Sequence, residues 1–240
     1  MRTWSATRAT RATPATRAIR ATRATPVIRV TRAGRVLSCL VTGTAVGTLL
    51  ACSTPGGSGS EGDSDGWTVT VYYTAVQRYH RGPATRVTGC PTIECTRGAA
   101  DLGTYPADFV AAVRDEGTGR TVSGRYLNWS YDTGYWLDDA PRDSDGGVLR
   151  PFRSAAADPG VLPSGTVFSL VSCGLNEEGG PAEATVCARL RQARWVVTDE
   201  FTPGLGGDRH LDLYIGEETG AGFTEGPWYA TFVGVRLRTD

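Results

Sequence analysis

The sequence predicts a mainly β domain, built as a closed or nearly closed barrel with long loops. Three observations lead to this fold class. Short runs of alternating, β-branched or aromatic residues recur along the chain, clusters of Gly, Pro and Asp separate them, and only two short segments have a helical pattern. Many short strands with few helices are typical of barrels, in which closure leaves no free strand edge.

Six runs are expected to form strands, because each alternates apolar and polar residues or is rich in Val, Thr, Tyr and Trp. They are residues 67–74, 125–131, 166–172, 194–198, 210–215 and 228–237. Successive side chains of a strand point to opposite sides, so in the fifth run Leu211 and Leu213 share one face and Asp212 lies on the other.

Two short helices are expected between the strands. The first begins at Pro106, whose fixed φ suits a first helical turn, and stops at Gly117. The second covers residues 181–193, where Val186 and Leu190 are spaced to share one buried face.

The charge of the chain is divided unevenly. Nine of the 25 basic residues precede Cys52 and no acidic residue does, so the part after it carries 16 Arg against 25 Asp and Glu, a net charge of −9. An acidic body repels phosphate, so nucleic acid is not expected as a partner. Lys is absent, which excludes a P-loop lysine and Schiff-base chemistry.

Residues 1–51 have the pattern of a secretory signal. Arg-rich repeats lead into an apolar run at residues 36–51, which is shorter than the roughly 20 residues of a membrane-spanning helix. The run ends in Leu-Leu-Ala-Cys, which resembles a bacterial lipobox and implies lipidation of Cys52 and anchoring to the outer face of the cell membrane. An ordinary secretion signal is the alternative. The Gly- and Ser-rich residues 52–66 are expected to be a flexible tether.

Four cysteines remain in the exported part, and an even number in an exported chain indicates two disulfides. They are Cys90, Cys95, Cys173 and Cys187. Three pairings are possible, of which Cys90–Cys95 and Cys173–Cys187 are favoured because each closes a local loop. The spacing lacks a Cys-x-x-Cys pair, so neither a metal site nor a cofactor is expected.

Three aspartates stand in distinctive contexts. Asp158 follows Pro-Phe-Arg-Ser-Ala-Ala-Ala, Asp199 ends Trp-Val-Val-Thr-Asp, and Asp212 lies within His-Leu-Asp-Leu-Tyr. The order of these motifs over residues 147–237 resembles the three-aspartate (3D) domain, a family similar to the catalytic part of membrane-bound lytic transglycosylase A. The resemblance implies a six-stranded double-psi β-barrel within a single domain at residues 67–240, with an N-terminal extension that has no counterpart.

The resemblance also implies an activity and a partner. Family members cleave the β-1,4 bond between N-acetylmuramic acid and N-acetylglucosamine in peptidoglycan glycan strands and form a 1,6-anhydro ring. Carried over by position, Asp212 is the acid/base catalyst, and Asp199 and Asp158 raise its pKa and hydrogen-bond the groove. One carboxyl group serves both steps, whereas ordinary glycoside hydrolysis uses two. The chain is expected to act as a monomer.

Four further side chains are expected to contact the sugar. Tyr135 and Trp136 belong to an aromatic-rich stretch, and flat apolar rings suit sugar faces, although core packing is the alternative for each ring. His210 is expected on the strand face of Asp212, and Arg153 belongs to the first aspartate motif.

The second motif departs from the family pattern and keeps other functions open. Asp199 is followed by Glu-Phe-Thr-Pro in place of the usual Thr-Gly-Gly. This difference favours, as the alternative function, a non-catalytic polysaccharide-binding module of the expansin kind, because a fold alone does not fix a function. A third candidate is a disulfide-stapled interaction or inhibitor domain in which the aspartates are structural.

Overall fold

The computed structural model describes residues 62–240. The expected signal, Cys52 and the first part of the expected tether lie outside the described residues. The first strand begins at Gly62, ahead of the expected start at Trp67, and Gly62 pairs with Thr239 near the other end of the chain. Within the described part, no helix combines the length and the apolar character that crossing a bilayer requires.

The described residues form twelve strands, two α-helices and two short 3-10 helices. The strands are β1 (Gly62–Val76), β2 (Ala84–Gly89), β3 (Ala100–Pro106), β4 (Thr118–Arg120), β5 (Tyr126–Ser130), β6 (Gly134–Asp138), β7 (Ser154–Ala157), β8 (Val167–Ser172), β9 (Leu175–Asn176), β10 (Trp195–Asp199), β11 (His210–Glu217) and β12 (Phe232–Thr239). The helices are η1 (Gln77–Tyr79), α1 (Ala107–Glu116), α2 (Ala184–Gln192) and η2 (Phe223–Glu225).

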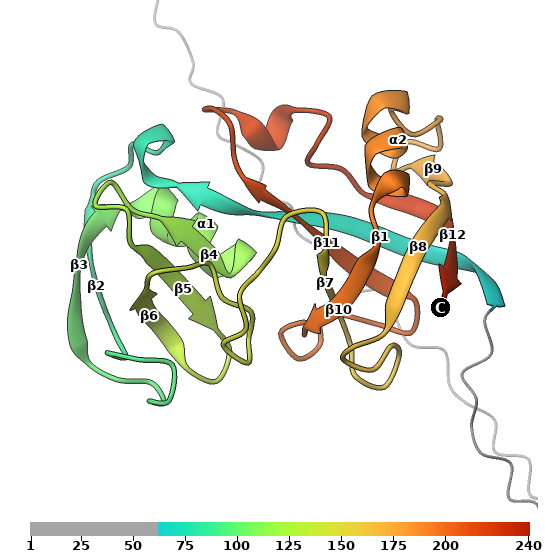
Figure 1. Ribbon diagram of the computed structural model, residues 1–240. Helices are drawn as coiled ribbons and strands as arrows, with labels where there is room; N and C mark the ends of the chain where they lie inside the picture. Colours follow the sequence, from blue (N-terminus) through green and yellow to red (C-terminus); the bar gives the residue numbers. More distant parts are fainter. Residues whose placement is uncertain (1–61) are drawn as a thin grey trace, which may run out of the picture. The chain divides into compact units, whose positions relative to one another are not determined.

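Six of these strands close into a barrel (Figure 1). Their order is β1-β11-β7-β10-β8-β12, and β12 pairs back with β1. The pairs β1–β11 and β7–β10 are parallel, and the other four pairs are antiparallel. The predicted six-stranded double-psi barrel is therefore confirmed. Strand β7 is not among the six expected strands, because its Ser-Ala-Ala-Ala sequence is buried throughout and shows no alternation of polarity.

The barrel core explains which side chains face outward. Val69, Val71, Leu211 and Leu213 are at most 4% exposed and pack together inside. Burying each such side chain contributes roughly 1.5–3 kcal/mol, so the core fixes the register of β1 and β11. The residues between them, among them Asp212, consequently lie on the outer face of the barrel, as the sequence predicts.

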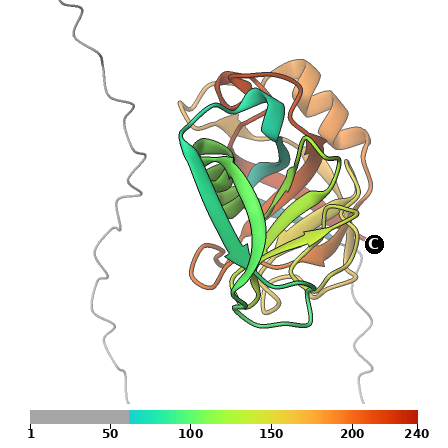
Figure 2. The same cartoon turned by 90° about the vertical axis from the view of Figure 1, so that its left-hand side faces the viewer.

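Residues 77–149 form a second group of elements, the small lobe. It holds the sheet β4-β5-β6, the helix α1 and the hairpin β2–β3. Strand β1 runs through both groups, since its last residues Ala75 and Val76 pair with β4. Helix α1 buries Phe109 and Val113 against this sheet, and the hairpin covers the helix (Figure 2).

Both helices agree with their sequence signals. In α1, Pro106 is the residue before the first helical position, and the helix stops at Gly117, whose φ of 81° is the left-handed conformation that glycine tolerates best. Helix α2 begins after Glu183, whose carboxylate accepts a hydrogen bond from the backbone N–H of Val186 at 2.7 Å.

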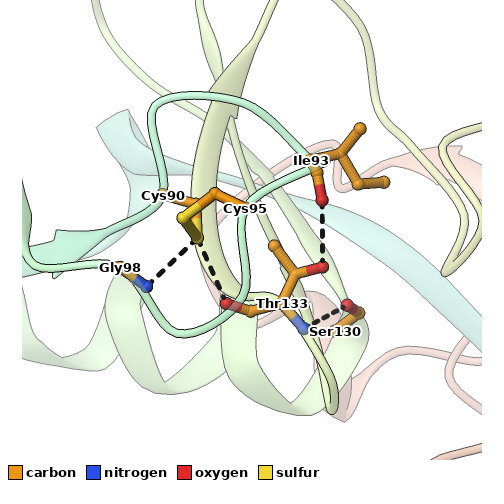
Figure 3. Close-up of a disulfide and its surroundings, with 6 residues drawn as sticks. All are labelled: Cys90, Ile93, Cys95, Gly98, Ser130 and Thr133. Atoms are coloured by element: carbon orange, nitrogen blue, oxygen red, sulfur yellow. Dashed lines mark hydrogen bonds between the residues drawn. A yellow bond between two sulfur atoms is a disulfide. The ribbon is translucent and has the colours of Figure 1, made fainter.

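The two favoured disulfides, Cys90–Cys95 and Cys173–Cys187, are confirmed. The first holds a loop against the β5–β6 turn (Figure 3). In that loop the N–H of Gly98 donates to the sulfur of Cys90, and the hydroxyl of Thr133 donates to the carbonyl of Ile93. The second bond joins the residue after β8 to helix α2.

A histidine ties the small lobe to the end of a barrel strand. His80 Nε2 lies 2.7 Å from Glu218 Oε1, just after β11, and His80 Nδ1 lies 3.7 Å from Asp108 Oδ2 in α1. The hydrogen bond to Glu218 raises the pKa of His80 above its ordinary value, against the opposing effect of burial. The glutamate side chain is 5% exposed, and His80 is the cationic partner beside it.

We expect His80→Gln to lower the free energy of unfolding by about 2 kcal/mol at pH 6, because a buried carboxylate loses its cationic partner. The contribution of the charged imidazole is complete below pH 6.5 and is lost as the pH rises through the higher folded-state pKa. Urea unfolding from pH 5.5 to 9 measures the difference, which should shrink as the pH rises. Arg86→Gln is the control, since its pair with Asp101 is exposed and contributes little.

Candidate active site

Two of the predicted aspartates lie in one row across the barrel sheet. Asp212 on β11 pairs in register with Ala156 on β7, and Asp199 on β10 pairs with Ala156 from the other side. On β1, Thr70 completes the row next to Asp212. Neighbouring strands are about 4.8 Å apart, so the backbones of the two aspartates are separated by about 10 Å with only a methyl group between them.

The carboxyl group of Asp212 is shielded from solvent. The residue is part-buried, and Oδ1 is enclosed and has no hydrogen-bond partner. Burial raises the pKa of Asp212 to about 7, and the charge of Asp199 adds to the rise against the opposing effect of Thr70. At neutral pH this group is therefore divided between its acid and its carboxylate form.

Asp199 is held by three hydrogen-bond donors. The backbone N–H groups of Ser144 and Glu200 each donate to Oδ1 at 2.9 Å, and the hydroxyl of Tyr72 donates to Oδ2 at 3.2 Å. Burial raises the pKa of Asp199, and these donors oppose the rise because they stabilise the ionised form. Sequence reasoning missed Tyr72 and Ser144, because neither stands near an aspartate motif in the chain.

Asp158 follows the end of β7, two residues after Ala156 and outside the row. Its Oδ2 accepts a hydrogen bond from the backbone N–H of Gly207 at 2.9 Å. A Cβ atom at Gly206 would come within 2.2 Å of Asp158 Oδ1, so the loop approaches the carboxylate closely only because glycine stands there. Asp158 thus fixes the β10–β11 loop.

His210 lies beside the row and stacks on the loop that Asp158 holds. Its ring is 4.6 Å from that of Phe201, centroid to centroid, and Nε2 is 3.0 Å from the hydroxyl of Thr70. Burial lowers the pKa of His210, so the imidazole is neutral at pH 7. Phe201 occupies the segment in which this chain departs from the family pattern.

The other predicted sugar-contacting residues do not gather around Asp212. Trp136 is 0% exposed and has no surface to offer a sugar, so the prediction for this residue is wrong. The ring of Tyr135 packs against the small-lobe core that contains Phe109, and its hydroxyl donates to the carbonyl of Val110. Arg153 is exposed at the opposite end of β7 from Asp158.

Two carboxyl groups of the small lobe interact with the aspartates of the row. Glu116, at the end of α1, is buried, and it accepts hydrogen bonds from the N–H of Tyr73 and the hydroxyl of Tyr229. Burial, and next the charge of Asp212, raise its pKa well above the ordinary value. Burial and the charge of Asp199 raise the pKa of Asp143 to about 6.

A small recess opens at the Asp199 end of the row. Its lining mixes carboxylates, hydroxyls and apolar groups: Asp145, Ala157, Pro159, Leu162, Ser164, Val197, Thr198, Asp199 and Glu200. Within residues 62–240, no three His, Cys, Asp or Glu side chains meet as a metal ion would require. The chemistry that the arrangement offers is proton transfer by a neutral carboxyl group next to a fixed charge.

No family model matches the chain, and no curated protein matches it. Several solved structures that resemble it are lytic transglycosylases. Escherichia coli MltA with bound chitohexaose aligns with a TM-score of 0.48 and 14% identity over 75% of this chain and 72% of that chain. The membrane-bound lytic murein transglycosylase of Agrobacterium tumefaciens aligns at 0.45 and 12% over 72% and 73%. LtgG of Burkholderia pseudomallei aligns at 0.40 and 18% over 74% and 72%. Scores and identities as low as these do not establish a function for this chain.

We expect Asp212→Asn to stabilise the protein at pH 8 by about 2 kcal/mol, because it removes a buried charge. The folded-state pKa lies above the ordinary 3.8, so the native state binds more protons than the unfolded one and loses stability as the pH rises from about 4 to about 7. The gain of the variant should grow over that range and then level off.

Urea unfolding at pH 4, 6 and 8 measures this gain. Asp139→Asn is the control, since that side chain is 85% exposed. A gain that does not change with pH, or one that the control shares, contradicts the burial of the Asp212 charge.

Proposed function

We propose that this chain is a peptidoglycan lytic transglycosylase, which cleaves the bond between N-acetylmuramic acid and N-acetylglucosamine and leaves a 1,6-anhydro end. The observation that supports it is the row of Asp212, Ala156 and Asp199, in which a carboxyl group with a pKa of about 7 faces a second, firmly held carboxyl group.

The first step needs an acid. Protonated Asp212 donates its proton to the glycosidic oxygen, and the bond between that oxygen and C1 of the muramic acid breaks. Positive charge then develops at C1. The Asp199 carboxylate, fixed by three donors, is placed to stabilise this charge without having to reorient.

The second step needs a base at the same place. Asp212 is now a carboxylate, and it removes the proton from the C6 hydroxyl while O6 bonds to C1. The proton that left Asp212 is thereby replaced, and no water is consumed. Oδ1 of Asp212 has no protein partner, and because it is enclosed, these transfers require the surrounding side chains to move aside.

The sugar itself would lie against the β10–β11 loop. The Phe201 and His210 rings form a stacked pair next to Asp212, and an aromatic face suits the apolar face of a sugar. His210 is neutral, so it offers a hydrogen-bond partner without a charge. In this proposal Asp158 acts through the loop that it holds and is a positioning residue.

A non-catalytic glycan-binding module is the second candidate. Phe201 favours it, because a ring replaces a glycine that the family pattern places after the second aspartate, and the ring stacks beside the row. Such a module would use the same surface to bind the glycan and would leave its chain length unchanged.

The location follows from the N-terminal sequence. We propose export by the signal in residues 1–51 and a lipid anchor on Cys52 at the outer face of the membrane, which would keep the domain next to the cell wall.

Digestion of purified cell wall tests the activity. We expect 1,6-anhydro products with the intact protein, and a loss of at least about 1,000-fold with Asp212→Asn, because the amide can neither donate nor accept the transferred proton. Asp139→Asn should keep full activity. Binding of the wall without anhydro products identifies the second candidate, and no binding at all contradicts both.

The pH profile of the same reaction gives a separate prediction. Because Asp212 must start protonated, the rate at low substrate should fall tenfold per pH unit above about 7, and Asp212→Glu should move that midpoint. Initial rates between pH 5 and 9 measure it. A rate that rises through pH 8 contradicts the assignment of Asp212 as the acid.

Metabolic labelling with palmitate in a bacterial host tests the anchor. The full chain should be labelled and should remain in the membrane fraction, whereas Cys52→Ser should be unlabelled. An unlabelled full chain of reduced size identifies an ordinary secretion signal.

A further inference from the structure

Tyr72 reaches across the barrel sheet to the second aspartate. It lies on β1 in register with Tyr214 on β11, and it is 6% exposed. Strands β11 and β7 separate β1 from β10, yet the Tyr72 hydroxyl donates to Asp199 Oδ2 at 3.2 Å. The side chain can span two strands because β7 contributes only Ser and Ala in this region.

Tyr72 donates to a different oxygen of Asp199 than the two backbone donors do. Both backbone donors, from Ser144 and Glu200, are directed at Oδ1, and Tyr72 supplies the hydrogen bond to Oδ2. The ring of Tyr72 is fixed in turn, since it packs on Tyr214 at 5.2 Å and on Leu149. A rigid aromatic arm therefore sets the orientation of the carboxylate plane.

We propose that Tyr72 is a positioning residue whose hydroxyl holds the Asp199 carboxylate opposite Asp212. The catalytic part of this inference rests on the proposed function, whereas the positioning part stands on the contacts alone. Tyr72 is 6% exposed and offers a sugar almost no surface, so in this proposal it acts on the reaction through Asp199.

The charges of the two aspartates also help to keep the Tyr72 hydroxyl protonated. Burial and the neighbouring charges of Asp199 and Asp212 raise the pKa of Tyr72, so the hydroxyl stays a donor over the working range. The titratable groups that face the two aspartates come from several elements. They are Tyr72 on β1, Glu116 on α1, Asp143 before β7, Glu200 after β10 and Tyr229 before β12.

The test compares two changes of the same kind, Tyr72→Phe and Tyr214→Phe. Both rings are buried and lie in register, but the Tyr214 hydroxyl is bonded to Thr74 at 2.5 Å and not to a carboxylate. Each variant keeps the ring and removes one hydroxyl, so the packing of the sheet is retained. Thermal unfolding of both variants checks that the fold is intact.

Carboxyl ¹³C NMR titration of the full exported domain gives the first readout. Loss of a donor to the ionised form should raise the midpoint of Asp199 by about one pH unit in Tyr72→Phe. Tyr214→Phe should leave that midpoint unchanged. This readout does not depend on enzymatic activity, so it decides the positioning role even if the chain cleaves no glycan.

Kinetics give the second readout. If the wild-type chain releases anhydro products, Tyr72→Phe should lower kcat by about tenfold with KM unchanged, since the residue touches no substrate. An unchanged Asp199 midpoint, or an equal shift in Tyr214→Phe, overturns the positioning role. A shifted midpoint with full kcat overturns its catalytic part.

Discussion

The pairing of Asp212 and Asp199 with a single alanine is the constraint on which the rest of the site depends. It places one carboxyl group on each side of a residue too small to fill the space between them. The register that produces this row is fixed by the apolar side chains on the opposite face of the same strands, Leu211 and Leu213 above all. A slip of one residue would turn both leucines outward and Asp212 into the core. The interior of the barrel thus determines the geometry of its exterior.

Much of this arrangement follows from local sequence. The alternation around Asp212 correctly predicts the face of β11 on which it lies, and Gly117 correctly predicts the end of the first helix. The preference for short loops correctly predicts both disulfides. Strand β7 could not be predicted from local sequence, because a run of small residues buried on both sides shows no alternation of polarity. The burial of Trp136 could not be predicted either, since an aromatic residue in a strand suits a core and a binding surface equally well.

The partners of the aspartates lie beyond local sequence for a different reason. Tyr72 and Ser144 are far from Asp199 along the chain, and only the order of the strands brings them to it. Glu116 comes from a helix outside residues 147–237, which carry the three motifs. A resemblance of motifs points to the proposed reacting groups, whereas several of the hydrogen bonds and charges around them come from residues that no motif contains.

The sharing of β1 between the two groups of strands has a mechanical consequence. One end of this strand closes the barrel against β12, and the other end begins the sheet of the small lobe. Without β1, neither the barrel nor the small lobe has a complete set of backbone hydrogen-bond partners. The two parts therefore cannot separate by bending at a linker. Thermal unfolding should consequently be one cooperative transition. Cleavage of a loop in the barrel or in the small lobe should destabilise the other part as well.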